Sequence, residues 1–362
     1  MKWPEHGGQP NKIFALKGKT NDHNFFDFSA NINPLGPPHE LKANLLTAFD
    51  QFEKYPDPDY HEETNLVAAH AGVHRDEVLL TNGGSEAIFL VTQLFSGKKA
   101  LIIEPTFSEY ERACQVYQLS VSHVSLRLDH DFSFPLEKVL SNLEEVDVVF
   151  LCRPNNPTGT VVTIEDVKAL LEKGLECQTT IIVDEAFIHF LPPGITDLTH
   201  LMDTYTNLIL LRSLTKIYAI PSLRLGYVIA KPNVIGHLKK NQIPWSINGV
   251  VASFLPSLVT QDVFIETTQS WLQEQLELLT TELTNLGFYY SPTCVNFYLL
   301  KDLEQRTDTE ELFEFLLNNK IIPRHTHTFK GLNGKYLRMA VRSAEENKYL
   351  LETLRNWREK TC

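Results

Sequence analysis

The chain has 362 residues, 43% of them apolar and 10% aromatic, which is enough to bury a large core and to form more than one domain. Its formal net charge is -12 and it holds no dense block of Lys and Arg, so nucleic acid is not expected as a partner. No apolar run approaches the roughly 20 residues that span a bilayer, and the N-terminus lacks the apolar core of a signal peptide, so we expect a cytoplasmic protein with no membrane partner.

The first 40 residues are rich in Gly, Pro, Asn and His, a composition typical of an extended arm that packs onto another part of the molecule. Apolar side chains then recur at helical spacing between residues 41 and 52, which predicts a helix. The segment 55–60, rich in Pro and Tyr, ends this helix. We therefore expect an arm over residues 1–40 and a large domain that begins at residue 41.

Six short apolar runs alternate with helical patterns between residues 78 and 230. Fully apolar strands separated by helices indicate a mostly parallel sheet that is covered on both faces. The expected strands lie at 78–80, 100–103, 148–151, 181–183, 208–211 and 227–230. One connecting helix is expected to begin after Thr163, with Asp166 three residues on as a loose capping box. The large domain is predicted to end at residue 245.

The pattern changes after residue 245, where a long helix is expected near residues 264–286. Strands are then expected at 296–300 and 336–341, a shorter helix near 310–317, and a final helix that begins at Ser343 and Glu346. Helices and strands in this order predict a smaller α+β domain over residues 246–362.

Lys216 stands directly after an apolar strand, where its amine would leave the sheet for a loop. An amine in that place can hold a carbonyl cofactor. Ser213 and Arg224 flank the lysine, and a hydroxyl with a guanidinium offers several charge-matched donors to a cofactor phosphate. A solvated surface lysine is the simpler interpretation of this segment alone, so the hypothesis depends on the other motifs.

Two further polar residues follow apolar strands. Asp184 comes at the end of a buried strand, where an unpaired carboxylate is costly, and the nitrogen of a protonated pyridine would serve as its cationic partner. Asn156 lies in a turn rich in Pro and Gly, and its amide can donate to a phenolic oxygen of the same cofactor. A plain turn explains Asn156 equally well.

Gly84 and Ser85 lie at a strand-to-helix junction, where free backbone N–H groups and the helix dipole favour a phosphate. Phe107 follows the next strand and is able to stack on a pyridine ring, although a core aromatic is the commoner explanation of a single Phe. The five cysteines contain no CxxC pair, so no metal site is predicted.

The order and spacing of these segments resemble the class I and II aminotransferases, which depend on pyridoxal 5′-phosphate (PLP), and within them the histidinol-phosphate aminotransferase branch. A narrower resemblance is to the L-threonine-O-3-phosphate decarboxylases of cobalamin biosynthesis. The segments 6–8, 27–36, 55–60 and 212–227 carry this narrower resemblance. It implies the PLP-dependent transferase fold type I, an α/β fold whose large domain holds a mostly parallel seven-stranded sheet beside a smaller α+β domain.

The resemblance also implies roles for single residues. Lys216 would hold PLP as a Schiff base, Asp184 would face the pyridine nitrogen and Asn156 the phenolic oxygen. The other residues implied at the cofactor are Gly84, Ser85, Ser213 and Arg224 at its phosphate, Phe107 on its ring, and Tyr55 reaching the phosphate in a neighbouring subunit. The role of Tyr55 implies a homodimer with shared active sites.

A phosphorylated small amino acid is the substrate class that the resemblance implies. The residues implied at the substrate are His6, Gly7, Asn31, Asn156, Arg324 and Arg338. Arg338 is favoured for the carboxylate and Arg324, with His6 and Gly7, for the phosphate, but the opposite assignment stays open. Lys216 is the natural acid to return a proton to Cα.

Phe187 favours decarboxylation over transamination, because the aminotransferases usually have Tyr at this position and the decarboxylases have Phe. The expected reaction is therefore decarboxylation of O-phospho-L-threonine to (R)-1-aminopropan-2-ol phosphate. Two alternatives stay open, a histidinol-phosphate aminotransferase and a decarboxylase of O-phospho-L-serine, since one methyl group is worth only about 1–3 kcal/mol of discrimination.

Overall fold

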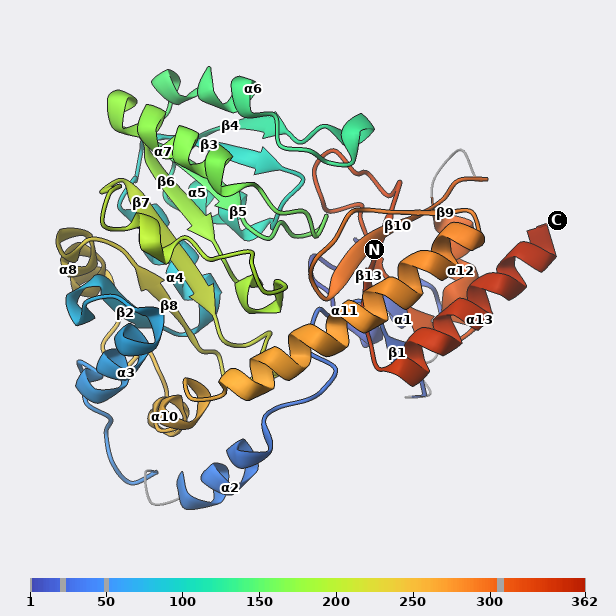
Figure 1. Cartoon of the computed structure of the whole chain (residues 1–362), viewed down its shortest axis with the longest axis horizontal. Coiled ribbons are helices and arrows are strands. Elements are labelled where there is room, and N and C mark those ends of the chain that lie inside the picture. The colour runs from blue at the N-terminus through green and yellow to red at the C-terminus, as the bar shows by residue number, and fades with distance from the viewer. Residues whose placement is uncertain (1, 20–23, 49–51, 305–308, 362) are drawn as a thin grey trace.

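The computed structural model describes residues 2–19, 24–48, 52–304 and 309–361. A large sheet with helices on both sides fills one half of the molecule, and a small sheet with helices on one side fills the other half (Figure 1). The long helix α11 (Asp262–Asn285) runs between the two halves and contacts both of them. This arrangement agrees with the predicted α/β class.

The large sheet has seven strands in the order β2-β8-β7-β6-β5-β3-β4. β8 is antiparallel to both of its neighbours, and the other adjacent pairs are parallel, so the sheet is mostly parallel as predicted. Its strands are β2 (Val78–Thr81), β3 (Lys99–Glu104), β4 (Ser120–Ser125), β5 (Val148–Cys152), β6 (Thr180–Asp184), β7 (Leu208–Ser213) and β8 (Gly226–Ile229). Six of them match the predicted apolar runs.

Helices cover both faces of this sheet because successive side chains of its strands point to opposite sides. In β6, Ile182 packs with α4 and α5, whereas Ile181 and Val183 belong to the core on the side of α7. These helices are α3 (His61–Ala71), α4 (Gly83–Gln93), α5 (Glu109–Val116), α6 (Leu136–Leu140), α7 (Ile164–Cys177) and α8 (Pro232–Asn241). The predicted start of α7 is confirmed, since the Thr163 hydroxyl accepts a hydrogen bond from the backbone N–H of Asp166.

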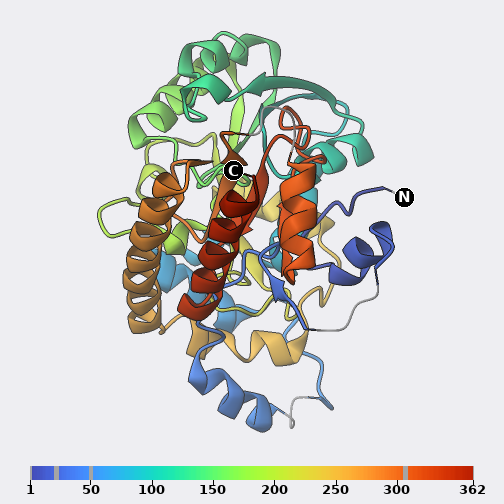
Figure 2. The same cartoon turned by 90° about the vertical axis from the view of Figure 1, so that its right-hand side faces the viewer.

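The small sheet is antiparallel, with the strand order β12-β13-β10-β9. The helices α11, α12 and α13 lie side by side over it (Figure 2). The remaining elements of this half are β9 (Phe288–Tyr290), β10 (Phe297–Asp302), α12 (Glu310–Asn318), β12 (Arg324–His325), β13 (Leu337–Ala340) and α13 (Ala344–Thr361). Ser343 and Glu346 form the predicted capping box of α13, each side chain accepting from the other residue's backbone N–H.

The N-terminal arm differs from the expectation of a wholly extended chain. It contains α1 (Pro10–Leu16) and β1 (Phe26–Asp27), and β1 pairs with β11 (Ile321–Ile322) in parallel. Pro10 begins α1 because proline fits the first turn of a helix. The arm is therefore tied to the C-terminal half by backbone hydrogen bonds, while the predicted domain boundaries at residues 40 and 245 stay a prediction.

The helix predicted for residues 41–52 corresponds to α2 (His39–Thr47), and residues 49–51 lie outside the described part of the chain. Two further short helices, α9 (Gly249–Ala252) and α10 (Leu255–Leu258), precede α11. Among the described residues, no helix is both long and apolar enough to cross a membrane.

Candidate active site

A cavity of about 720 Å³ lies where the carboxyl ends of the large sheet's strands face the small sheet and the arm. Thirteen of the fourteen residues predicted for the cofactor and the substrate line this cavity, and Tyr55 is the exception. The thirteen are His6, Gly7, Asn31, Gly84, Ser85, Phe107, Asn156, Asp184, Ser213, Lys216, Arg224, Arg324 and Arg338. Residues as far apart in sequence as His6 and Arg338 therefore meet in one place.

Lys216 follows β7 and projects into the cavity, where its side chain is half-buried. Desolvation, followed by the nearby positive charges of Arg338 and Arg224, lowers the pKa of its amine to about 8. A substantial fraction of Lys216 is consequently neutral near pH 8, and a neutral amine is the form that attacks a carbonyl carbon.

Asp184 ends β6 and is only 8% exposed. One carboxylate oxygen accepts the backbone N–H of Ala186 at 2.9 Å, and the other accepts the hydroxyl of Tyr110 at 2.6 Å. Burial raises the pKa of Asp184, and these two hydrogen bonds oppose the rise. None of the described cationic side chains forms an ion pair with it, so Asp184 is suited to a cationic ligand atom.

The start of α4 forms a narrow cradle with Arg224. A Cβ atom placed on Gly83 would lie 2.5 Å from the Nη2 atom of Arg224 and would push this guanidinium away, and the φ of +74° at Gly83 also favours glycine. Ser213 is buried, and its hydroxyl lies 2.8 Å from that of Thr215. The free N–H groups at a helix start, two hydroxyls and a guanidinium are the donors that a phosphate group requires.

Phe107 and Tyr110 form one wall of the cavity. Their rings meet edge to face with centroids 5.9 Å apart, and Tyr110 also stacks on Phe150 at 5.5 Å. The sequence analysis selected Phe107 and missed Tyr110. Tyr110 follows Phe107 by three residues at the start of a helix, and this spacing places both rings on the same side. The spacing is the signal in the sequence that could have identified Tyr110.

Arg324 and Arg338 are direct cross-strand partners in the antiparallel pair β12 and β13. Side chains opposite one another in this way lie on the same face of the sheet, roughly 5 Å apart at Cβ. The two are 2% and 6% exposed, and burial lowers the pKa of Arg324 to about 10 and that of Arg338 to about 9. Within the described ranges neither has a carboxylate partner, so the pair attracts anions.

The two guanidinium groups contact different parts of the molecule. Arg338 donates to the side-chain oxygen of Asn156 at 2.6 Å and to the backbone oxygen of Ser29 at 2.7 Å. Its buried Nε atom has no hydrogen-bond partner in the described part of the chain. Asn156 thereby has its oxygen engaged, which leaves its NH₂ group to donate to a ligand. Arg324 donates to the backbone oxygen of Pro4 at 3.0 Å and to the hydroxyl of Thr328 at 2.7 Å, so it also holds the arm.

The arm forms the remaining wall through His6, Gly7 and Gly8. The Nε2 atom of His6 lies 3.1 Å from a carboxylate oxygen of Glu109. A Cβ atom on Gly7 would lie 1.9 Å from the backbone oxygen of Ser29, so glycine is required for this close approach. The side-chain oxygen of Asn31 is buried and has no hydrogen-bond partner among the described residues, as expected for a group that binds a ligand.

Phe187 is 4% exposed, lines the cavity, and packs edge to face on Phe297 at 4.8 Å. Tyr55, in contrast, is 84% exposed and lies against Trp245 with ring centroids 5.1 Å apart. The structure therefore does not bring Tyr55 to the cavity of its own chain.

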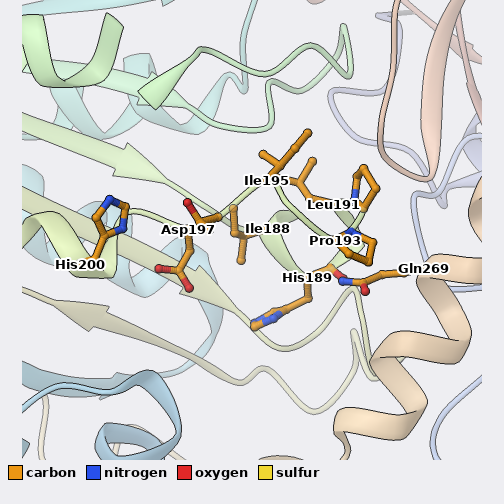
Figure 3. A pocket seen from close by; sticks show the side chains of 10 residues that line it. Ile188, His189, Leu191, Pro193, Ile195, Asp197, His200 and Gln269 are labelled. Atoms are coloured by element: carbon orange, nitrogen blue, oxygen red, sulfur yellow. The ribbon is translucent and has the colours of Figure 1, made fainter. Parts of the chain in front are cut away.

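A second cavity of about 560 Å³ lies between the segment 188–200 and Gln269 of α11 (Figure 3). Half of its lining residues are Ile, Leu or Pro, and its carboxylate, Asp197, is already paired with Arg212 at 3.5 Å. It shares no lining residue with the first cavity, which holds the chemically reactive groups.

The sequence profile described as aminotransferase class I and II matches residues 23–354 of the chain. The chain belongs to the class I and II aminotransferase family. The cofactor of this family, and of this chain, is PLP. The seven-stranded sheet with a smaller α+β part is the fold that this chain shares with solved aminotransferase structures.

Among curated relatives, the chain is 33% identical over 359 residues to the threonine-phosphate decarboxylase of Salmonella typhimurium, which covers 97% of this chain and 96% of the relative. It is 31% identical over 361 residues to the adenosylcobalamin biosynthesis bifunctional protein CobDQ of Leptospira interrogans, but spans only 41% of that longer protein. Among solved structures, the histidinol-phosphate aminotransferase of Clostridium acetobutylicum superposes with a TM-score of 0.86 at 29% identity, covering 92% of this chain and 99% of that one.

The residues in the cavity fit PLP. Asp184 is a buried carboxylate that has no cation among the described residues, Arg224 and Gly83 enclose a space for a phosphate, and Lys216 has a partly neutral amine. The free NH₂ group of Asn156 suits the phenolic oxygen of the cofactor. Each polar group of PLP therefore has a matching group in this chain.

Proposed function

We propose that this chain decarboxylates O-phospho-L-threonine to (R)-1-aminopropan-2-ol phosphate, as a step in building the cobalamin nucleotide loop. The observation that carries the proposal is the cross-strand pair Arg324 and Arg338, two buried cations side by side that lack a carboxylate partner in the described chain. A substrate with a carboxylate and a phosphate supplies two anionic groups at this spacing. The relatives named as threonine-phosphate decarboxylases support the same substrate.

The position of each arginine supports a division of roles. Arg338 is close enough to lower the pKa of Lys216, so it stands near the reacting carbon and suits the carboxylate. Arg324 contacts the arm that carries His6 and Gly7, so these three groups suit the phosphate. Both guanidinium groups can bind an anion with two parallel hydrogen bonds, which fixes orientation as well as charge.

The bound cofactor supplies an electron sink for the bond that breaks at the substrate's Cα. The protein determines which bond at Cα breaks, because it holds the substrate's anionic groups in fixed positions. Arg338 and Asn156 hold the carboxylate side, and the arm covers the cavity and excludes water. Once CO₂ has left, the ammonium form of Lys216 is the acid placed to give a proton to Cα.

Phe187 supports decarboxylation over transamination. An apolar ring packed on Phe297 stands where the aminotransferase resemblance predicts a tyrosine hydroxyl, so one hydrogen bond to the phenolic oxygen is missing. Transamination of histidinol phosphate is the second candidate, and the similarity to the Clostridium aminotransferase structure favours it.

We also propose a homodimer with shared active sites. Tyr55 is exposed on its own chain and packs with Trp245, whose indole N–H donates to the backbone oxygen of Pro56 at 3.2 Å. These contacts fix the conformation of the loop at residues 55–56 while the Tyr55 side chain stays exposed. An exposed side chain on a fixed loop suits contact with a second copy of the chain. A cytoplasmic location is part of the proposal too, and the four described cysteines are unpaired thiols, as is usual in reducing compartments.

The proposal is tested by giving the PLP-loaded enzyme either O-phospho-L-threonine alone or histidinol phosphate with and without 2-oxoglutarate. We expect CO₂ and aminopropanol phosphate from the first mixture, with no need for an acceptor. Turnover of histidinol phosphate that requires 2-oxoglutarate, with no CO₂ from phosphothreonine, would support the second candidate instead.

A further inference from the structure

Tyr110 lies in the cavity wall, behind the residue that faces the cofactor's ring nitrogen. Its hydroxyl donates to the Oδ2 atom of Asp184 at 2.6 Å, and the two residues are only 1% and 8% exposed. The other oxygen of Asp184 accepts the N–H of Ala186. A carboxylate has about four acceptor sites, so two hydrogen bonds leave room for a third from a ligand.

The direction of the Tyr110 hydrogen bond is fixed by its surroundings. Burial and the neighbouring Asp184 raise the pKa of Tyr110 well above its ordinary value, so its hydroxyl keeps its proton and can only donate to the carboxylate. The same hydrogen bond opposes the effect of burial on Asp184, whose pKa would otherwise rise further. The Tyr110 ring is held between Phe150, on which it stacks, and the edge of Phe107.

We propose that Tyr110 is a positioning residue for the cofactor, which acts through Asp184 to hold the ring nitrogen and at the same time sets the place of Phe107 against the ring. The Tyr110 side chain thus contacts both Asp184, at the ring nitrogen of the cofactor, and Phe107, on which the cofactor ring stacks. The inference rests on the PLP assignment alone, so it stands or falls independently of the substrate.

The test compares two cofactors in the Tyr110→Phe variant, whose ring can keep both aromatic contacts. PLP is the first, and the second is an analogue with a carbon atom in place of the ring nitrogen. Because a hydrogen bond to a charged group is lost, we expect PLP to bind roughly tenfold to a hundredfold more weakly than in the wild type. The analogue should bind the two proteins equally, since it has no nitrogen for Asp184 to hold.

Two comparisons separate positioning from a merely structural role. Tyr205→Phe removes another tyrosine-to-carboxylate hydrogen bond, to Glu172 at 3.0 Å and away from the cavity, and should leave the affinities for both cofactors unchanged. In an Asp184→Asn background, Tyr110→Phe should cause less further loss of PLP affinity than it does alone. An equal loss for PLP and the analogue, or no loss for either, would overturn the proposal.

The folded state of each variant is checked by its circular dichroism and melting temperature without cofactor. If Tyr110→Phe does not fold, 3-fluorotyrosine at position 110 keeps the ring and gives a stronger hydroxyl donor. It should bind PLP at least as tightly as the wild type and leave the affinity for the analogue unchanged. A parallel change for both cofactors would again contradict a role through Asp184.

Discussion

Arg338 donates a hydrogen bond of 2.6 Å to the side-chain oxygen of Asn156, which joins the small sheet to the loop after β5. The bond orients the Asn156 amide, because an engaged oxygen leaves the NH₂ group pointing to the ligand. It also holds Arg338 without neutralising its charge. The cavity therefore keeps its attraction for an anion while its shape is fixed.

Replacing Asn156 by Asp should neutralise the charge of Arg338 and remove the amide donor. The new carboxylate would pair with Arg338 and would place negative charge beside the phenolic oxygen of the cofactor. We expect kcat/KM to fall by about two orders of magnitude, equivalent to roughly 3 kcal/mol, since a charge-assisted contact is lost and a repulsion is added. The melting temperature without ligands should rise. An activity close to the wild type would show that the amide donor is not needed.

The two arginines should differ in their effect on phosphorylated and unphosphorylated substrates. Arg324→Met should raise KM for O-phospho-L-threonine far more than for L-threonine, at a cost of roughly 2–5 kcal/mol. Arg338→Met should weaken both, because both carry the carboxylate. The reverse pattern would exchange the two roles. Arg355→Met is the control, since it removes a positive charge on the exposed side of α13, away from the cavity, and it should leave the KM of both substrates unchanged.

The pKa of Lys216, about 8, predicts how fast the apoprotein captures PLP. A lysine with a lowered pKa is a protonated, unreactive ammonium below pH 8 and a neutral amine above it, so the capture rate should rise through pH 8 and then level off. Arg338→Met removes a positive charge that lowers this pKa, and it should move the midpoint to higher pH. Arg355→Gln, on the exposed side of α13, should leave it in place. Stopped-flow absorbance in the visible range, where the lysine-bound cofactor absorbs, measures both rates.

Mixed dimers test whether Tyr55 serves the neighbouring subunit. Lys216→Ala and Tyr55→Phe proteins should each have little activity alone. After subunit exchange, a hybrid dimer holds one site with both native residues, so up to about a quarter of wild-type activity should return. No recovery after proven exchange, or a fully active monomer, would contradict shared sites.

The sequence predicted the parts of the fold that bury apolar runs, and it missed those that depend on pairing partners. β4 was not predicted because its alternating Ser, Val and His residues leave it polar, as suits the edge of the sheet. β12 has two residues, too few for any periodicity, and it is a strand only because β13 lies beside it. The helix α1 in the arm was missed because its surroundings are rich in Gly and Pro.

The cofactor residues were predicted from motifs and the substrate residues from the family resemblance alone, and neither source predicted the electrostatics of the site. No pattern in the sequence places Arg324 opposite Arg338, since strand register is decided by contacts between distant segments. The contact between Tyr110 and Asp184 spans 74 residues and was missed for the same reason. Tyr55 was assigned to another subunit from the resemblance alone, and its exposure on this chain is consistent with that role.

Two labelled atoms in the substrate show which bond at Cα the enzyme breaks. The enzyme is given O-phospho-L-threonine carrying ¹³C in its carboxylate and deuterium at Cα, with no acceptor, and the products are followed by NMR. We expect that ¹³C leaves as bicarbonate while the deuterium stays on the carbon that becomes C1 of the aminopropanol phosphate. Loss of the deuterium to solvent while the ¹³C stays in an organic acid would mean that the bond to hydrogen breaks instead, and would contradict the assignment.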